Sequence, residues 1–174
     1  MPDSIHRSSG WHVQCRRSAA LGLAFACSAV HAAGCPATQQ TLFTCSTGRS
    51  TLAVCTTPDL SVTTGTLQYR FGRTGAVPWT YPLADADWRA VTRGATLAFS
   101  GGGGAYLAFD RPPYRYVVYT ATGRGWGRKA GVVTEKDGLR IANLVCKGKE
   151  RAELGPDLFE RAGVSEDTVG FDLP

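Results

Sequence analysis

Two cysteines close two short apolar runs, and this pattern constrains the fold more than any other in the chain. Residues 42–45 are Leu-Phe-Thr-Cys, residues 51–55 are Thr-Leu-Ala-Val-Cys, and a polar segment that contains Gly48 separates them. Two β-prone runs around a glycine-containing turn predict an antiparallel hairpin. Because Cys45 and Cys55 are symmetric about Ser50, we expect them to lie opposite each other and to form a Cys45–Cys55 disulfide.

Residues 1–33 have the pattern of a signal peptide. Arg16 and Arg17 precede an apolar run over residues 19–26, and Val30-His31-Ala32 provides the residues that a signal peptidase accepts. The apolar run is too short to span a bilayer. The sequence therefore predicts an exported protein, periplasmic or secreted, without a transmembrane segment.

Removal of residues 1–33 leaves four cysteines: Cys35, Cys45, Cys55 and Cys146. An even number of cysteines in an exported chain predicts two disulfides, although four cysteines allow three pairings. With Cys45 joined to Cys55, the second disulfide is Cys35–Cys146. Ala32-Ala33-Gly34-Cys35 also resembles the end of a bacterial lipobox, so lipid anchoring at Cys35 is an alternative. Soluble export is favoured, because the usual large aliphatic residue is absent and lipidation would leave an odd cysteine.

The region from residue 34 to residue 150 has the pattern of an all-β domain. Short apolar runs alternate with Gly, Pro and Asp, and two prolines place residues 77–82 at a sheet edge or in an extended loop. Eight or nine strands of this kind predict a small antiparallel β-sandwich or closed barrel. Strands are expected over residues 66–71, 95–99, 105–109, 114–120, 130–134 and 139–146, with a glycine loop over residues 100–104 and a tight turn at Asp137-Gly138.

Residues 151–174 form a third region, an acidic C-terminal tail. It carries Asp157, Glu160, Glu166, Asp167 and Asp172. We expect this tail to be irregular apart from one helical turn over residues 157–161.

The composition after residue 33 excludes several kinds of site. All three histidines lie in the predicted signal peptide, so a Ser-His-Asp or Cys-His site cannot form. The cysteine spacings contain no close pair, and we expect neither a metal nor another cofactor. The chain keeps 16 basic and 13 acidic residues, and their scattered arrangement predicts no nucleic-acid partner.

Carboxylates are the remaining candidates for acid–base chemistry. Asp85 and Asp87 lie near aromatic residues in the sequence, as in some glycosidase sites, and Asp110 is a third candidate. The alternative interpretation of residues 83–88, which we favour, is a polar loop with an aspartate cap and a buried Trp88.

Residues 123–129 are a second candidate loop. They read Gly-Arg-Gly-Trp-Gly-Arg-Lys, and exposed Trp and Arg are residue types that anchor interfaces. We therefore take Arg124, Trp126 and Arg128 as candidate binding residues. The alternative is that Trp126 folds back onto the protein.

Several short motifs resemble those of a group of small exported proteins of Gram-negative bacteria, a group without an established activity. The resemblance rests on Phe43-Thr44-Cys45, Val54-Cys55, residues 67–72 (Leu-Gln-Tyr-Arg-Phe-Gly) and the segment from Asp137 to Cys146. More loosely, the domain resembles the periplasmic lysozyme inhibitors. Those proteins insert a Ser-Gly-x-x-Tyr loop into a lysozyme cleft, and the nearest match here is Ser100 with Tyr106, in which the tyrosine lies two positions later.

These observations favour a non-enzymatic exported binding protein with a protein partner such as a lysozyme. The resemblance implies contacts by Ser100 and Tyr106, and the basic loop adds the three residues named above. Two alternatives stay open: a carboxylate-dependent enzyme that acts on envelope glycans, and an envelope structural or assembly protein. The sequence leaves the oligomeric state open.

Overall fold

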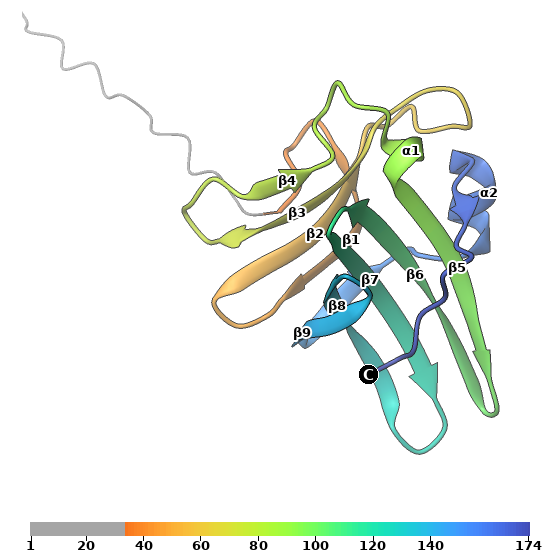
Figure 1. Cartoon of the computed structure of the whole chain (residues 1–174). Coiled ribbons are helices and arrows are strands. Elements are labelled where there is room, and N and C mark those ends of the chain that lie inside the picture. The colour runs from red at the N-terminus through yellow and green to blue at the C-terminus, as the bar shows by residue number, and fades with distance from the viewer. Residues whose placement is uncertain (1–33) are drawn as a thin grey trace, which may run out of the picture.

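The computed structural model describes residues 34–174, which form two β-sheets packed face to face (Figure 1). The predicted signal peptide, residues 1–33, lies outside the described residues. The predicted all-β sandwich is confirmed. The alternative of a closed barrel is wrong, because each sheet ends in edge strands that do not pair with the other sheet.

The first sheet has five strands in the order β10-β1-β2-β3-β4. Its edge strand β4 contains only three residues between Pro78 and Pro82, in agreement with the edge position predicted for this segment. The bounds of its strands are β1 Gln40–Ser46, β2 Ser50–Thr56, β3 Leu67–Arg73, β4 Trp79–Tyr81 and β10 Lys147–Ala152.

The second sheet has six strands in the order β11-β5-β6-β7-β8-β9. Its central strands are consecutive hairpins, and the predicted Asp137-Gly138 turn connects β8 to β9 with positive φ at both residues, 51° and 76°. The bounds are β5 Thr92–Phe99, β6 Gly102–Arg111, β7 Tyr114–Gly123, β8 Gly127–Lys136, β9 Leu139–Val145 and β11 Ser165–Glu166, with two helices at α1 Trp88–Val91 and α2 Pro156–Ala162.

The core lies between the inner faces of the two sheets. Alternate residues of each strand point inward, and burial of their apolar surface is the main stabilising contribution. The fully buried members include Phe43, Leu52, Val54 and Leu67 from the first sheet and Leu107, Phe109, Val118 and Val132 from the second.

The glycine run differs from its prediction as a loop. Gly102, Gly103 and Gly104 pair with residues of both β5 and β7 and so belong to strand β6. The turn between β5 and β6 is limited to Ser100 and Gly101, where Gly101 has a φ of 80°. These glycines are strand residues because strands β5 and β7 pair with them on both sides.

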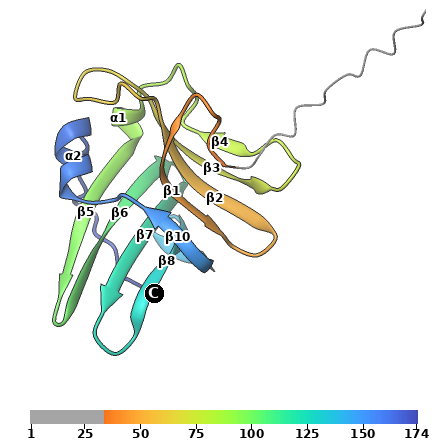
Figure 2. The same ribbon diagram turned by 180° about the vertical axis from the view of Figure 1, so that it is seen from behind.

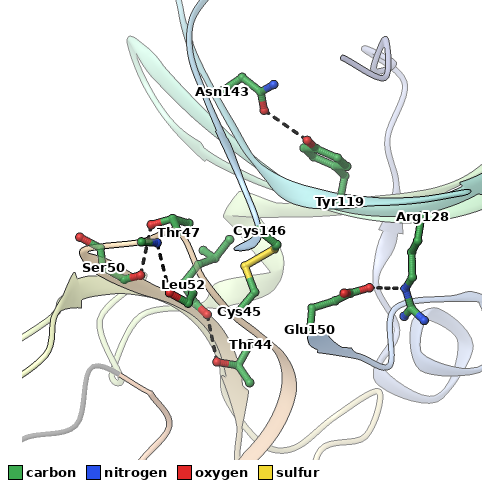
Figure 3. The surroundings of a disulfide bond; sticks show 12 residues. Thr44, Cys45, Thr47, Ser50, Leu52, Tyr119, Arg128, Asn143, Cys146 and Glu150 are labelled. Carbon is green, nitrogen blue, oxygen red and sulfur yellow. Dashed lines mark hydrogen bonds and ion pairs between the residues drawn. A yellow bond between two sulfur atoms is a disulfide. The ribbon is translucent and has the colours of Figure 1, made fainter. Parts of the chain in front are cut away.

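The predicted disulfide pairing is wrong. The bonds are Cys35–Cys55 and Cys45–Cys146, the second of which is shown in Figure 3. Ser46 pairs with Thr51, so the hairpin is centred between Gly48 and Arg49 rather than at Ser50. Cys45 consequently lies opposite Leu52 and faces the core. Cys55 follows Val54, a core residue, so it points to the opposite face of the sheet. The two cysteines of the hairpin therefore cannot meet, and Cys35 is engaged with Cys55 rather than available for lipidation.

The C-terminal region is more ordered than the predicted irregular tail. Strand β10 pairs with β1, and β11 forms a short parallel bridge to β5. Helix α2 lies beside β5 and buries Leu158 and Ala162 (Figure 2). The predicted helical turn at residues 157–161 is thus confirmed as part of a longer helix.

Candidate functional site

Two hairpin turns of the second sheet lie side by side at the end of the molecule. The hairpins β5–β6 and β7–β8 extend beyond the first sheet (Figures 1 and 2). The backbone N–H of Arg124 in the second turn donates to the carbonyl oxygen of Gly101 in the first, at 2.9 Å. We call the residues Phe99, Ser100, Arg124, Trp126 and Lys129 at this place the hairpin-end surface.

Glycines hold the two aromatic rings of this surface in place. A Cβ atom at Gly123 would lie 2.2 Å from the Trp126 ring, and one at Gly102 would lie 2.6 Å from the Phe99 ring. Both rings therefore pack directly on strand backbone, with centroids 5.7 Å apart. Trp126 is still 39% exposed and Phe99 36% exposed. The result is a fixed aromatic pair that is open to solvent.

The surface is also basic. Residues 97–104 and 121–131 contain no Asp or Glu. Arg128 pairs with Glu150 (Figure 3), and the Lys129 ammonium lies 5.1 Å from the Trp126 ring centre and donates to the Pro174 backbone oxygen at 2.7 Å. Within residues 34–174 the exposed side chain of Arg124 makes neither a hydrogen bond nor an ion pair. Arg124 is therefore the cation of this surface that is free to meet a partner.

The structure brings Ser100, Arg124 and Trp126 together but separates Tyr106 from them. Tyr106 lies within β6, and the strand alternation turns it to the outer face of the sheet. There it is only 2% exposed, because C-terminal residues such as Phe171 pack over it. The expectation that Ser100 and Tyr106 act together is therefore wrong. Arg128 lies next to the surface, but its guanidinium forms an ion pair with Glu150.

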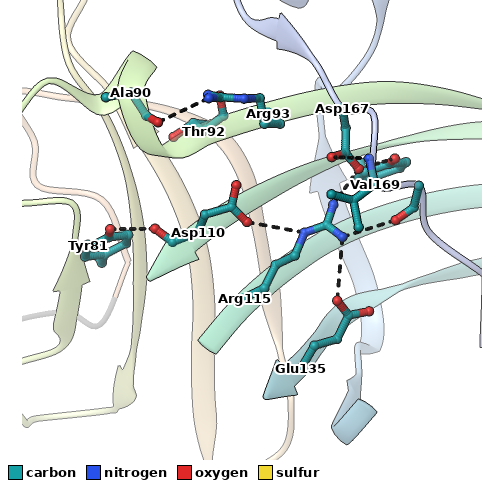
Figure 4. A network of polar contacts seen from close by, with 11 residues as sticks. Tyr81, Ala90, Thr92, Arg93, Asp110, Arg115, Glu135, Asp167 and Val169 are labelled. Carbon is teal, nitrogen blue, oxygen red and sulfur yellow. Dashed lines mark hydrogen bonds and ion pairs between the residues drawn. The ribbon is translucent and has the colours of Figure 1, made fainter. Parts of the chain in front are cut away.

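Tyr106 instead belongs to a polar network that holds the C-terminal residues; Figure 4 shows the part of this network around Arg115 and Asp167. Its hydroxyl donates to Asp167 Oδ2 at 2.6 Å, and the Arg115 guanidinium pairs with the same carboxylate. Arg115 also lies 3.4 Å from Asp110 and 3.6 Å from Glu135. Phe171 packs on Tyr106 with ring centroids 5.1 Å apart. This network has a structural role, because it fixes residues 167–171 on the outer face of the second sheet.

Burial of tyrosines makes stability sensitive to high pH. Burial raises the pKa of Tyr69, Tyr81, Tyr106 and Tyr119 above their usual value, and the Asp167 carboxylate adds to the pKa shift of Tyr106. Below a pH of about 10 these groups are protonated in both states, so their contribution is complete. Above that pH the unfolded chain releases protons that the folded protein retains, so the free energy of unfolding should fall. Urea midpoints measured between pH 8 and pH 11 test this, and a constant midpoint would contradict it.

The three aspartates considered for catalysis lie in two parts of the fold, the segment before α1 and the end of β6. Asp87 accepts a hydrogen bond from the Arg89 N–H at 3.0 Å as the cap of α1. Trp88 is buried and donates to the Gly65 carbonyl oxygen at 3.0 Å. The favoured interpretation of residues 83–88 is thus confirmed. Asp85 is exposed in the turn before α1, and Asp110 lies at the end of β6 beside Arg115.

Two further findings concern residues 34–174. They contain no group of three or more His, Cys, Asp or Glu side chains that could hold a metal ion. In the same residues no helix has the length and apolar character needed to cross a bilayer.

A scan against protein-family models finds no match to the chain, and neither does a search of curated proteins or of solved structures. Sequence reasoning missed Phe99, Lys129 and the role of Gly123. Extending the strand alternation through residues 97–104 would have identified Phe99, but the packing of Trp126 on Gly123 has no local sequence signal.

Proposed function

We propose that the protein is a non-enzymatic binding protein, periplasmic or secreted, that docks its hairpin-end surface on an acidic part of another protein. The observation that supports this most is the exposed Trp126–Phe99 pair, which is fixed on glycine backbone beside the unpaired Arg124. Aromatic residues and arginine contribute most of the binding energy in many interfaces. A pair that is already ordered loses little conformational entropy on binding.

The shape and charge of the hairpin ends favour an acidic cleft as the complementary surface. The two hairpins protrude from the sandwich, and their cations have no acidic residue beside them in the turns. Enzymes that cleave glycans carry two carboxylates within a cleft, so their charge complements a basic, protruding end. Lysozymes belong to this class, and they are the partner that the resemblance implies.

Inhibition of lysozymes tests the proposal. We expect the exported, oxidised protein to reduce lysis by at least one of the c-type, g-type and i-type enzymes. Arg124→Glu should weaken inhibition by on the order of tenfold or more, because it places a carboxylate against an acidic cleft. Arg73→Glu is the matched control, since Arg73 is an exposed arginine at the end of β3 and its replacement changes the net charge equally. Full lysis by all three enzymes at micromolar excess would reject a lysozyme partner.

Two further variants test the aromatic pair in the same assay. Trp126→Ala removes the ring, and Gly123→Ala leaves the ring but places a methyl group where it packs. Both should weaken inhibition by a similar factor, on the order of 30-fold for a central anchor. Unchanged inhibition by both variants, with folding verified by circular dichroism, would show that the hairpin-end surface is not the binding site.

A further inference from the structure

The outer face of the first sheet gathers cations that are scattered along the sequence. Paired residues of neighbouring strands share a face of the sheet, and one such row crosses all five strands through Arg151, Thr44, Ala53, Arg70 and Thr80. A second row, two positions further along the strands, contains Lys147, Ser46, Thr51 and Gly72. Arg70 lies between Tyr69 and Phe71, whose rings pack in the core, so both rows point away from the second sheet.

Three of these cations lie on the edge strand β10. Glu150 of this strand points to the second sheet, where it pairs with Arg128. Its neighbours Lys149 and Arg151 therefore point to the outer face, and both are exposed. Lys147 is exposed as well and belongs to the second row. Outward residues of a strand follow one another at about 7 Å, so this edge presents a line of cations.

Acidic residues hardly balance these cations. Strands β1 to β4 contain no Asp or Glu, and within residues 36–84 the single acidic residue is Asp59, in the loop between β2 and β3. Glu153 follows β10 and pairs with Arg151 at 2.6 Å, but both side chains are exposed. An exposed ion pair contributes little, so Arg151 can exchange Glu153 for another anion. We call the residues Arg70, Lys147, Lys149 and Arg151 the basic face.

The residues between the cations indicate the kind of partner. In the two rows they are small or carry a hydroxyl group, and neither row contains an aromatic or large apolar side chain. Protein interfaces are usually anchored by such side chains, and single-stranded nucleic acids stack on aromatic rings. Cations spread over a broad sheet face, with hydroxyl groups between them, instead complement a flat surface of phosphate groups.

We propose that the basic face docks on the surface of a membrane that contains anionic phospholipids, with its Arg and Lys side chains on the headgroup phosphates. Juxtaposed basic residues are attracted to such a surface. The contact is limited to the headgroups, because the two rows offer no apolar side chain to the hydrocarbon. The proposal does not rest on the proposed function, since the hairpin-end surface belongs to the second sheet and stays free.

Co-sedimentation with lipid vesicles tests the proposal, with the protein purified after export of the full chain. We expect binding to vesicles of equal parts phosphatidylglycerol and phosphatidylcholine, and little binding to vesicles of phosphatidylcholine alone. Raising the salt concentration from about 0.1 M to about 1 M shortens the Debye length from about 10 Å to about 3 Å, so it should release the protein. Equal binding to both kinds of vesicle, or binding that persists at high salt, would overturn the proposal.

The triple variant Lys147→Gln/Lys149→Gln/Arg151→Gln removes the line of cations on β10. All three side chains are exposed, so the fold should be retained. Each basic residue near an anionic membrane strengthens binding by about fivefold. We therefore expect the triple variant to bind the anionic vesicles more weakly by on the order of 100-fold.

Lys136→Gln/Arg140→Gln/Arg161→Gln is the matched control. It removes the same charge from exposed residues of the second sheet and of α2, and it should bind the vesicles almost as the wild type does. Equal weakening by the two triple variants would show an effect of net charge alone and would overturn the proposal. Absence of binding to anionic vesicles would also overturn it, and binding of inorganic polyphosphate through the β10 cations would then assign the basic face to a soluble polyanion.

Discussion

Replacement of both Cys45 and Cys146 by alanine is expected to lower the free energy of unfolding by about 5 kcal/mol, whereas replacement of Cys35 and Cys55 should lower it by about 3 kcal/mol. The difference arises because the first disulfide joins residues 101 apart and the second joins residues 20 apart. A cross-link over a longer loop removes more conformational entropy from the unfolded chain. Cys45 and Cys55 are both buried, so the loss of sulfur packing is similar in the two variants.

Urea unfolding of the two double variants measures these losses directly. Peptide mapping of the unreduced wild-type protein provides an independent control, because it should recover peptides that contain Cys45 joined to Cys146. Equal destabilisation by the two double variants would contradict the argument from loop length. A Cys45–Cys55 peptide would contradict the pairing itself.

Arg115→Met is expected to destabilise the protein by about 3–5 kcal/mol, the usual cost of removing one partner of a buried ion pair. The side chains of Arg115 and Asp167 are 10% and 2% exposed. Without Arg115, the Tyr106 hydroxyl is the one side chain of residues 34–174 that still bonds to the Asp167 carboxylate. Asp110 and Glu135, which also lie against Arg115, would then face Asp167 as like charges.

The double variant Arg115→Met/Asp167→Asn shows whether the loss comes from the buried charge. Asparagine has nearly the same shape as aspartate and can still accept the Tyr106 hydrogen bond, so we expect the double variant to recover part of the stability. Hydrogen exchange should locate the change at residues 167–174, which this network holds. A double variant that is as unstable as the sum of the single variants would show that the two residues are not coupled.

Local patterns in the sequence were sufficient for much of the fold. The alternation in residues 66–71, the prolines around β4 and the Asp137-Gly138 turn predicted their structures correctly. These features depend on interactions between near neighbours in the chain. The choice between a sandwich and a barrel depends on whether the edges of distant strands meet, and no local pattern contains that information.

The errors share a different cause. Gly102–Gly104 lack side chains and so have no pattern of their own, and the neighbouring strands β5 and β7 make them strand residues. A shift of the first hairpin's centre by less than two residues was enough to turn Cys45 and Cys55 to opposite faces. The order of the C-terminal residues depends on Arg115, which is 52 positions from Asp167.

The candidate site was predicted in part. Arg124 and Trp126 could be identified because residues 123–129 combine glycine, tryptophan and cations within one short segment. The arrangement of these residues could not be predicted. The turn at Ser100 and Gly101 comes to lie beside Arg124 only when β6 and β7 pair. Tyr106 was misplaced for the same reason, because its position depended on the glycine run.

The Cys45–Cys146 bond has a consequence for maturation in a chain that is exported as proposed. Cys35, Cys45 and Cys55 cross the membrane well before Cys146, and β1 cannot pair with β10 until the last part of the chain arrives. During that interval the cysteines of the described residues that can oxidise with Cys45 are Cys35 and Cys55, which form a disulfide with each other in the folded protein. Any bond that Cys45 forms at this stage must be exchanged later by attack of a free thiolate. Isomerisation of disulfides is therefore required in every chain in which Cys45 is oxidised before Cys146 arrives, and it is not required where Cys35 and Cys55 pair first.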